Sequence, residues 1–175
     1  PEYADVPLKE MMSKATADRI KAAHNALKTL NNSEYGGKYT IPEDGGTAHL
    51  SVLDKSGNAV ALTTTINTGF GSAYVAGDTG IILNNEMDDF VAQPGVPNAF
   101  GLIGRAANSV APGKVPLSSM TPTIVLKDGA VHLVVGASGG PTIITGTLQV
   151  LLNTLMFNMT ARRAVRAPRL HHQWQ

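Results

Sequence analysis

Residues 46–54 read GTAHLSVLD and residues 59–67 read AVALTTTIN, and the sequence KSGN at 55–58 separates the two segments. Both segments are rich in apolar and β-branched residues and flank a turn sequence, so together they predict an antiparallel hairpin. A hairpin that is symmetric about the second turn residue pairs Thr47 with Thr65. Because cross-strand partners point to the same face with Cβ atoms roughly 5 Å apart, two hydroxyl groups meet where the first strand begins.

The position of Thr47 suggests a nucleophile. A threonine at the start of a strand gains this role when the peptide bond before it is cut, because its freed α-amine is then the base. Residues 31–46 hold four glycines, Pro42 and few large apolar side chains, so we expect an exposed, flexible connection of the kind at which chains are cut. While the bond to Gly46 is intact, the nitrogen of Thr47 is an amide that cannot act as a base. The uncut chain is therefore a precursor-like form.

An acidic cluster follows the hairpin in the segment 83–90, LNNEMDDF. Three carboxylates within four residues, Glu86, Asp88 and Asp89, are compatible with acid/base chemistry, with a hard cation or with a solvated turn. The positions of the acidic residues and glycines exclude an EF-hand. The residues alone leave the other interpretations open.

A second hairpin is predicted by the segments 123–127 (TIVLK) and 130–135 (AVHLVV), because Asp128-Gly129 between them is a two-residue turn signal. Centring the turn there pairs residues whose numbers sum to 257. Pro122 has no N–H to donate to a ladder, so pairing can stop or shift before it.

Extended beyond the strands, this register brings Ser118 near Gly139 and Ser119 near Ser138. The segment 142–158 then has the apolar spacing of a helix. Backbone N–H groups at a strand-to-helix glycine turn suit an anion, although a lone Ser-Gly-Gly is more often a plain turn. Its predicted position beside the serine pair favours the anion site.

Five separated blocks carry a family resemblance. They are TAHLSV at 47–52, LNNEMDDF at 83–90, PLSSM at 116–120, Gly139-Gly140 and PRLH at 168–171. Their order and spacing resemble the small subunit of the γ-glutamyltranspeptidases, which are N-terminal nucleophile hydrolases. The resemblance implies an α+β fold that forms part of an αββα sandwich. It implies that residues 1–46 are the C-terminal helix and linker of the large-subunit part and that residues 47–175 are the catalytic small-subunit part. The large-subunit lobe and the C-terminal end of the family then lie outside this sequence.

The resemblance also implies a role for each matching residue. Thr47 is the nucleophile after cleavage between Gly46 and Thr47, and Thr65 orients it. Gly139 and Gly140 are the oxyanion donors. Asn67, Glu86 and Asp89 hold the substrate ammonium group, and Ser118 and Ser119 hold its α-carboxylate. Phe100 belongs to a lid formed by residues 94–105. Many bacterial members of the family have a tyrosine at the position of Phe100, so the aromatic wall is kept here and the hydroxyl is lost.

By resemblance, the expected activity is γ-glutamyl transfer or hydrolysis on glutathione and other γ-glutamyl amides, through a γ-glutamyl-threonine ester. Water, an amino acid or a dipeptide is the acceptor, and the large-subunit lobe of the same precursor is the partner. No cofactor and no metal are expected, and the location is periplasmic or extracellular. The alternatives are another acylase of the same superfamily, such as a β-lactam acylase, a poly-γ-glutamate transferase, or an unprocessed inactive fragment that binds a partner subunit.

Composition excludes several other classes. The 175 residues carry a formal net charge of +1 and 15% charged residues, which favours neither nucleic acid nor an anionic membrane surface. No apolar run approaches the ~20 residues that span a bilayer. Adjacent histidines at 171–172 point to opposite faces of an extended chain and predict no zinc site. His49 shares the face of Thr47 and is expected to be structural, and the segment 7–30 has helical periodicity.

Overall fold

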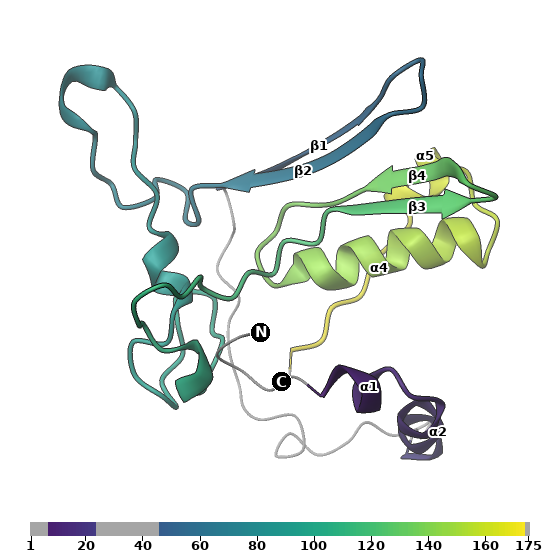
Figure 1. The fold of residues 1–175 in the computed structure, drawn as a ribbon, viewed down its shortest axis with the longest axis horizontal. Helices are drawn as coiled ribbons and strands as arrows, with labels where there is room; N and C mark the ends of the chain where they lie inside the picture. Colours follow the sequence, from purple (N-terminus) through teal and green to yellow (C-terminus); the bar gives the residue numbers. More distant parts are fainter. Residues whose placement is uncertain (1–6, 24–45, 174–175) are drawn as a thin grey trace.

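The computed structural model describes residues 7–23 and 46–173. Two antiparallel hairpins lie next to one another, and a long helix lies alongside the second hairpin (Figure 1). The strands are β1 (Thr47–Leu53), β2 (Ala59–Thr65), β3 (Thr123–Lys127) and β4 (Ala130–Val135). The α-helices are α1 (Leu8–Met11), α2 (Lys14–Ala23), α4 (Thr142–Leu155) and α5 (Ala161–Arg166), and the 3₁₀ helices are η1 (Gly77–Thr79), η2 (Glu86–Asp89) and η3 (Ala106–Asn108). The expected α+β fold is confirmed.

The β1–β2 hairpin has the register that its sequence predicts, with Thr47 opposite Thr65 along an unshifted ladder. Its turn is held by the Asp54 carboxylate, which accepts hydrogen bonds from the backbone N–H groups of Ser56 and Asn58, both at 2.8 Å. The Asn58 side chain donates a third hydrogen bond to this carboxylate at 2.7 Å. These hydrogen bonds lower the pKa of Asp54, and the bond from the Asn58 side chain has the largest effect. The turn therefore fixes which residues of the two strands face each other.

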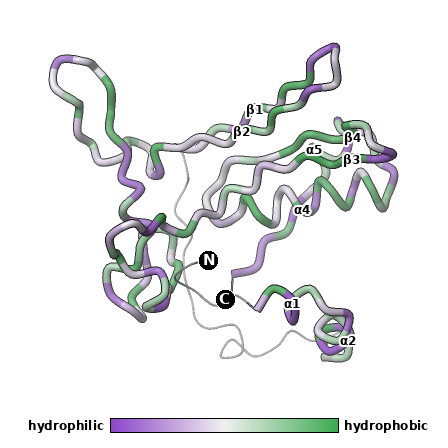
Figure 2. The backbone as a smooth tube through the Cα atoms, in the orientation of Figure 1, coloured by the Kyte–Doolittle hydropathy of each residue, from purple (hydrophilic) through white to green (hydrophobic). Residues whose placement is uncertain are grey.

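The two faces of this hairpin differ. One face carries exposed apolar side chains in the two pairs Leu50–Leu62 and Val52–Val60, and Figure 2 shows the alternation along the tube. The other face begins with the threonine pair and is turned toward β4, which contacts both β1 and β2. The face that carries chemistry is therefore the face that packs on the second hairpin.

In the second hairpin, the observed register differs from the predicted one beyond the first two pairs. Pairs near the turn have the expected register, but a β-bulge between Val125 and Leu126 shifts the rest by one residue, so that Thr123 lies opposite Val135. The extra residue on β4 is His132. Pairing ends at Thr123, immediately after Pro122, as expected from the missing N–H of proline. Beyond the bulge, the register predicted from the turn alone is wrong.

Helix α4 follows the glycine turn and lies along the β3–β4 hairpin (Figure 1). It buries Ile143, Thr147 and Val150, which recur at helical steps of three and four residues, and the Thr121 hydroxyl donates to Thr147 at 3.2 Å. The helix ends at Leu155, three residues before the predicted end. After it, Thr160 caps α5 by accepting from the N–H of Arg163 at 3.4 Å.

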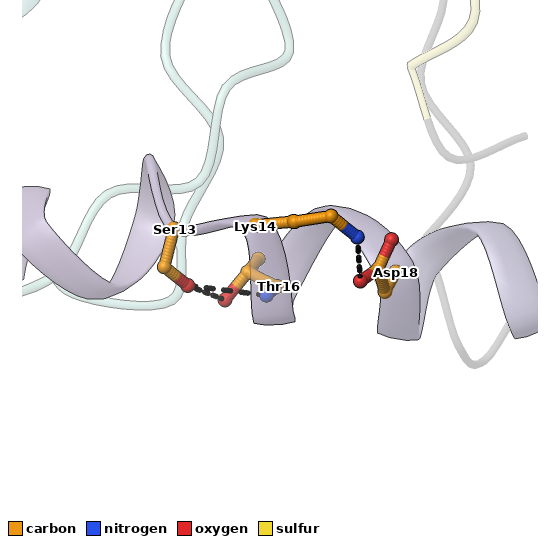
Figure 3. Close-up of polar contacts among 4 residues, drawn as sticks. All are labelled: Ser13, Lys14, Thr16 and Asp18. Carbon is orange, nitrogen blue, oxygen red and sulfur yellow. Dashed lines mark hydrogen bonds and ion pairs between the residues drawn. The ribbon is translucent and has the colours of Figure 1, made fainter.

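The single helix predicted over 7–30 is wrong for the residues that the structure describes. Its described part is two helices, α1 and α2, because Ser13 interrupts it (Figure 3). The Ser13 hydroxyl accepts from the N–H of Thr16 at 3.1 Å and so caps α2. Lys14 and Asp18 form an ion pair one turn apart on the surface. Residues 24–30, and the predicted flexible connection up to residue 45, lie outside the described residues.

The apolar residues 81–83, whose sequence is typical of a short strand, do not form one of the strands. They form an isolated antiparallel bridge between Ile82 and Val75. The N–H of Leu83 donates to the carbonyl of Tyr74 and the N–H of Ala76 donates to the carbonyl of Ile81, both at 2.9 Å. The long loop-like segment 91–114 is folded back on itself by bridges from Val91 to Ser109 and from Pro97 to Ile103. Within the described ranges, no helix is long and apolar enough to cross a bilayer.

Candidate active site

The threonine pair predicted from the hairpin forms a direct contact. The hydroxyl oxygens of Thr47 and Thr65 are 3.0 Å apart. The Thr65 oxygen also accepts from the N–H of Asn67 at 2.8 Å and donates to the carbonyl oxygen of Gly46 at 3.2 Å. Because a hydroxyl has one proton to give, and Thr65 gives it to Gly46, the Thr47 hydroxyl is the donor to Thr65. The pair therefore has a direction, from Thr47 through Thr65 to Gly46.

The carbonyl of Gly46 is held by two donors, the Thr65 hydroxyl and the N–H of Ile66, the latter at 3.2 Å. A side chain at position 46 has no room, because a Cβ there would lie 2.6 Å from the carbonyl oxygen of Thr68. The bond before Thr47 is thus polarised and closely packed against the segment that follows β2.

Asn67 joins the threonine pair to the acidic segment. It is buried and has a φ of 75°, in the left-handed region that asparagine tolerates. Its side chain donates to the carbonyl of Asn85 at 3.1 Å, and the Asn85 side chain accepts from the N–H and the hydroxyl of Thr68, each at 3.1 Å. These bonds bring η2, which begins at Glu86, next to the end of β2.

The carboxylates of η2 are electrostatically strained. Burial, the negative charge of Glu86 and, to a lesser extent, that of Asp88 raise the pKa of Asp89 to about 6, against a lowering interaction with Asn67. Burial also raises the pKa of Glu86. Both side chains are half-buried. A cationic group placed between them would offset the repulsion and the lost hydration, so this wall of the site suits an ammonium ion.

A metal site at this cluster is not supported. Among the residues described, no three His, Cys, Asp or Glu side chains are arranged to hold a metal ion. The Asp88 carboxylate instead accepts a hydrogen bond from the Asn85 side chain at 2.8 Å. One of the three carboxylates is therefore engaged within the local turn.

A second wall of the site contains the serine pair and the glycine turn. The Ser118 hydroxyl accepts from the N–H of Met120 at 3.1 Å. Gly139 and Gly140 have φ values of +126° and +53°, and the Gly139 carbonyl accepts from the N–H and hydroxyl of Thr142 at 3.0 and 2.6 Å. A Cβ on Gly139 would lie 2.4 Å from the Thr142 hydroxyl, so the turn at the start of α4 requires glycine there.

One cavity of about 580 Å³ collects most of the predicted site residues. Its lining includes Thr47, Thr65, Asn67, Glu86, Asp89, Phe100, Ser118, Ser119 and Gly140. Gly140 lines the cavity, whereas Gly139 does not. Phe100 is buried, with its backbone N–H donating to the side chain of Asn98 at 3.0 Å. Asn108 also lines the cavity, and no sequence pattern had indicated it.

His49 lies next to the threonine pair and contacts both hairpins. Its Nδ1 is 2.8 Å from the Thr63 hydroxyl, and its Nε2 is 3.1 Å from the Ser51 hydroxyl, which donates to the carbonyl of Val134 at 3.2 Å. Because Ser51 gives its proton to Val134, it accepts from Nε2–H, and Thr63 donates to Nδ1. The ring also lies against Gly136, where a Cβ would be 2.2 Å away. His49 is thus a structural brace, as expected, between β1 and the end of β4.

Fold and site together define an α+β protein with a strand-initial threonine at the wall of a cavity. This arrangement is typical of hydrolases with a threonine nucleophile. The family model of gamma-glutamyltranspeptidase matches residues 1–175, and the chain belongs to this family.

Individual relatives agree with this assignment. The glutathione hydrolase proenzyme of Escherichia coli is 50% identical over 99% of this chain, which spans only 30% of that relative's length. Another relative is glutathione hydrolase 4 of Arabidopsis thaliana, whose name includes the word inactive. It is 46% identical, and the match covers 99% of this chain and 92% of that protein. A crystal structure of a mutant gamma-glutamyltranspeptidase from Helicobacter pylori matches at 55% identity with a TM-score of 0.70, over 72% of this chain and 68% of that one.

Proposed function

We propose that this chain carries the catalytic small-subunit part of a γ-glutamyl transferase and hydrolase that acts on glutathione and related γ-glutamyl amides. The observation that carries the proposal is the 3.0 Å contact between the hydroxyls of Thr47 and Thr65 at the wall of a cavity that carboxylates and serines also line. A γ-glutamyl head group is a zwitterion. It needs acceptors for its ammonium group and donors for its carboxylate, and the two walls offer these.

The first proposed step is cleavage of the bond between Gly46 and Thr47. The Thr47 oxygen attacks the Gly46 carbonyl carbon while its proton passes to the Thr65 oxygen, and the Thr65 proton passes in turn to the carbonyl oxygen of Gly46. The Thr65 hydroxyl and the N–H of Ile66 stabilise the charge that forms on the carbonyl oxygen. The C–N bond then breaks, the nitrogen of Thr47 takes up a proton, and water hydrolyses the resulting ester. The products are a Gly46 carboxylate and a free Thr47 amine.

In turnover, the freed amine of Thr47 takes the proton of its own hydroxyl as the oxygen attacks the γ-carbonyl of the substrate. The charge on that carbonyl oxygen falls to the backbone N–H groups of Gly139 and Gly140. The leaving amine takes a proton, and a γ-glutamyl ester remains on Thr47. Water or an acceptor amine then attacks the ester, which gives the hydrolysis or the transfer product.

Within this proposal, head-group recognition is divided between the walls. Glu86, Asp89 and Asn67 hold the α-ammonium group. Burial and the negative charge of Glu86 raise the pKa of Asp89, and a bound cation offsets both effects. Ser118 and Ser119 donate to the α-carboxylate. Phe100 closes the cavity as part of the lid.

The proposed partner is the large-subunit lobe of the same precursor. Leu50, Val52, Val60 and Leu62 form an apolar face that the described residues leave exposed, as a face covered by further protein would be. Residues 1–46 then belong to the large-subunit part and residues 47–175 to the small-subunit part. We also propose a periplasmic or extracellular location for the full-length protein, which cell fractionation tests.

The test of the proposal is the mass of the full-length precursor after incubation. We expect two chains, the smaller of which begins at Thr47, and turnover of a γ-glutamyl anilide only after this cleavage. The variant Thr47→Ala keeps the fold of a strand start but lacks the hydroxyl, so it should stay one chain. Equal cleavage of this variant would contradict the proposed nucleophile.

The alternative of an inactive partner-binding chain has one observation in its favour. The Arabidopsis relative whose name includes the word inactive is matched over 92% of its length. A precursor that stays intact and binds the other lobe without turnover would support this alternative. A β-lactam acylase or a poly-γ-glutamate transferase would cleave itself equally, but the acylase would prefer a glutaryl amide and the transferase a polymeric substrate over glutathione.

A further inference from the structure

The side chain of Asn108 connects the two walls of the cavity. Its Nδ2 donates to the carbonyl oxygen of Asp89 at 2.7 Å, and its Oδ1 accepts from the N–H of Leu117 at 3.1 Å. One partner is an acceptor and the other a donor, so only one orientation of the amide satisfies both. Asp89 carries the proposed ammonium-binding carboxylate, and Leu117 directly precedes Ser118. A single amide therefore joins the backbone of one recognition element to that of the other.

The backbone of Asn108 strengthens this connection. Its carbonyl accepts from the N–H of Val91 at 2.9 Å, next to the parallel bridge between Val91 and Ser109. Its own N–H donates to the carbonyl of Arg105 at 2.9 Å, which closes η3. The residue is half-buried and lines the cavity. The segment 89–91 is thus held at two points by one residue.

We propose that Asn108 is a positioning residue that determines specificity for the α-amino acid head group, by fixing the distance between the carboxylates of η2 and the serine pair. This inference rests on the proposed function. The ammonium and carboxylate groups of such a substrate are attached to one carbon, so their separation is fixed. Both can be satisfied together only if the acceptors and donors of the site have the matching separation. A substrate that lacks the ammonium group makes no such demand.

Two substitutions separate this role from general stability. Asn108→Leu keeps the approximate size and removes both side-chain hydrogen bonds. Asn108→Asp is nearly isosteric and keeps the acceptor for Leu117, but it places an oxygen against the carbonyl of Asp89. The matched control is Asn58→Ala, which removes a side-chain hydrogen bond to Asp54 in the β1–β2 turn, away from the cavity.

The experiment uses the full-length precursor and compares a γ-glutamyl anilide with a glutaryl anilide, which lacks the α-ammonium group. Both Asn108 variants should still cleave themselves, with kcat for the γ-glutamyl substrate within about threefold of the parent. We expect KM for that substrate to rise about tenfold, which corresponds to the loss of a hydrogen bond or two. The ratio of kcat/KM between the γ-glutamyl and glutaryl substrates should fall by a similar factor, while Asn58→Ala leaves it unchanged.

The proposal is overturned if the ratio stays at the parent value in both Asn108 variants, or if both substrates lose activity equally. A fall in melting temperature with an unchanged ratio would show a structural role alone. If Asn108→Leu does not fold, the ratio measured for Asn108→Asp decides the question. Failure of the proposed function would give a different result from failure of this inference. The parent protein itself would then neither cleave its precursor nor turn over the γ-glutamyl anilide.

Discussion

The substitution Thr65→Val tests the geometry of the threonine pair most sharply, because it keeps a β-branched side chain in the strand and removes only the hydroxyl. That hydroxyl accepts from Thr47 and from the N–H of Asn67 and donates to the carbonyl of Gly46. Asn67 is buried, and an unsatisfied buried donor costs about 1–3 kcal/mol. The free energy of unfolding should fall by about this amount, with secondary structure retained.

The effect on chemistry should be larger. Removing one donor from a developing oxyanion typically costs ~10²–10³ in rate, and Thr65 is one of the two donors that hold the Gly46 carbonyl. The Thr47 hydroxyl also loses its acceptor and is free to rotate. We therefore expect self-cleavage to slow by about 10²-fold or more, measured as the half-life of the intact precursor by mass spectrometry, with a lower kcat after processing.

Thr64→Val is the matched control. Thr64 pairs with Ala48 on the opposite, exposed face of the hairpin, so its hydroxyl cannot reach the nucleophile. Cleavage and kcat should stay within about twofold of the parent. The reasoning fails if Thr65→Val is cleaved at the parent rate, or if Thr64→Val is the more damaging of the two.

Three further predictions concern the carboxylates of η2 and the His49 brace. Ammonium binding needs an ionised Asp89, and burial and the charge of Glu86 raise the pKa of Asp89 to about 6. The kcat/KM for a γ-glutamyl anilide should therefore fall as the pH drops through about 6. Glu86→Gln removes a like charge and should move this fall in kcat/KM to lower pH, so a fall that stays in place or moves to higher pH counts against the assignment. Asp89→Ala should leave self-cleavage intact and lower kcat/KM about 10²-fold, less than for a fully buried charge pair because Asp89 is half-exposed; a dependence of turnover on added calcium would instead support a cation site. His49→Phe should lower the free energy of unfolding by about 1–3 kcal/mol, because it loses the hydrogen bonds to Thr63 and Ser51. Gly136→Ala displaces the His49 ring and should destabilise the protein by a similar amount, measured by thermal unfolding. A Gly136→Ala variant as stable as the parent would refute the brace.

The sequence was sufficient for the first hairpin because its turn and its alternation agree. The residues around Ser56 form a closed turn, and no residue interrupts the ladder, so Thr47 and Thr65 could be paired by counting. The same counting failed in the second hairpin because His132 adds a bulge. A bulge depends on packing against neighbouring elements, and the local pattern of apolar residues carries no signal for it.

Local capping and long-range contacts explain the other differences. Helix α1 ends at Met11, and Ser13 then caps α2 although the apolar spacing continues through it, since capping competes with periodicity at serine. Asn85 and Asn108 act through hydrogen bonds to residues far along the chain, such as Thr68 and Asp89. Such contacts follow from the fold and not from any motif, so the walls of the site could be predicted while the residues that hold them together could not.

Whether Thr47 carries the substrate acyl group is tested directly by peptide mapping of the full-length protein, quenched in acid during turnover of a γ-glutamyl anilide. We expect a peptide that begins at Thr47 and carries one γ-glutamyl group as an ester on that residue. The ester should be absent from Thr47→Ala and lost on treatment with hydroxylamine. A γ-glutamyl group on another residue, or turnover by a chain in which Thr47 is still joined to Gly46, would contradict it.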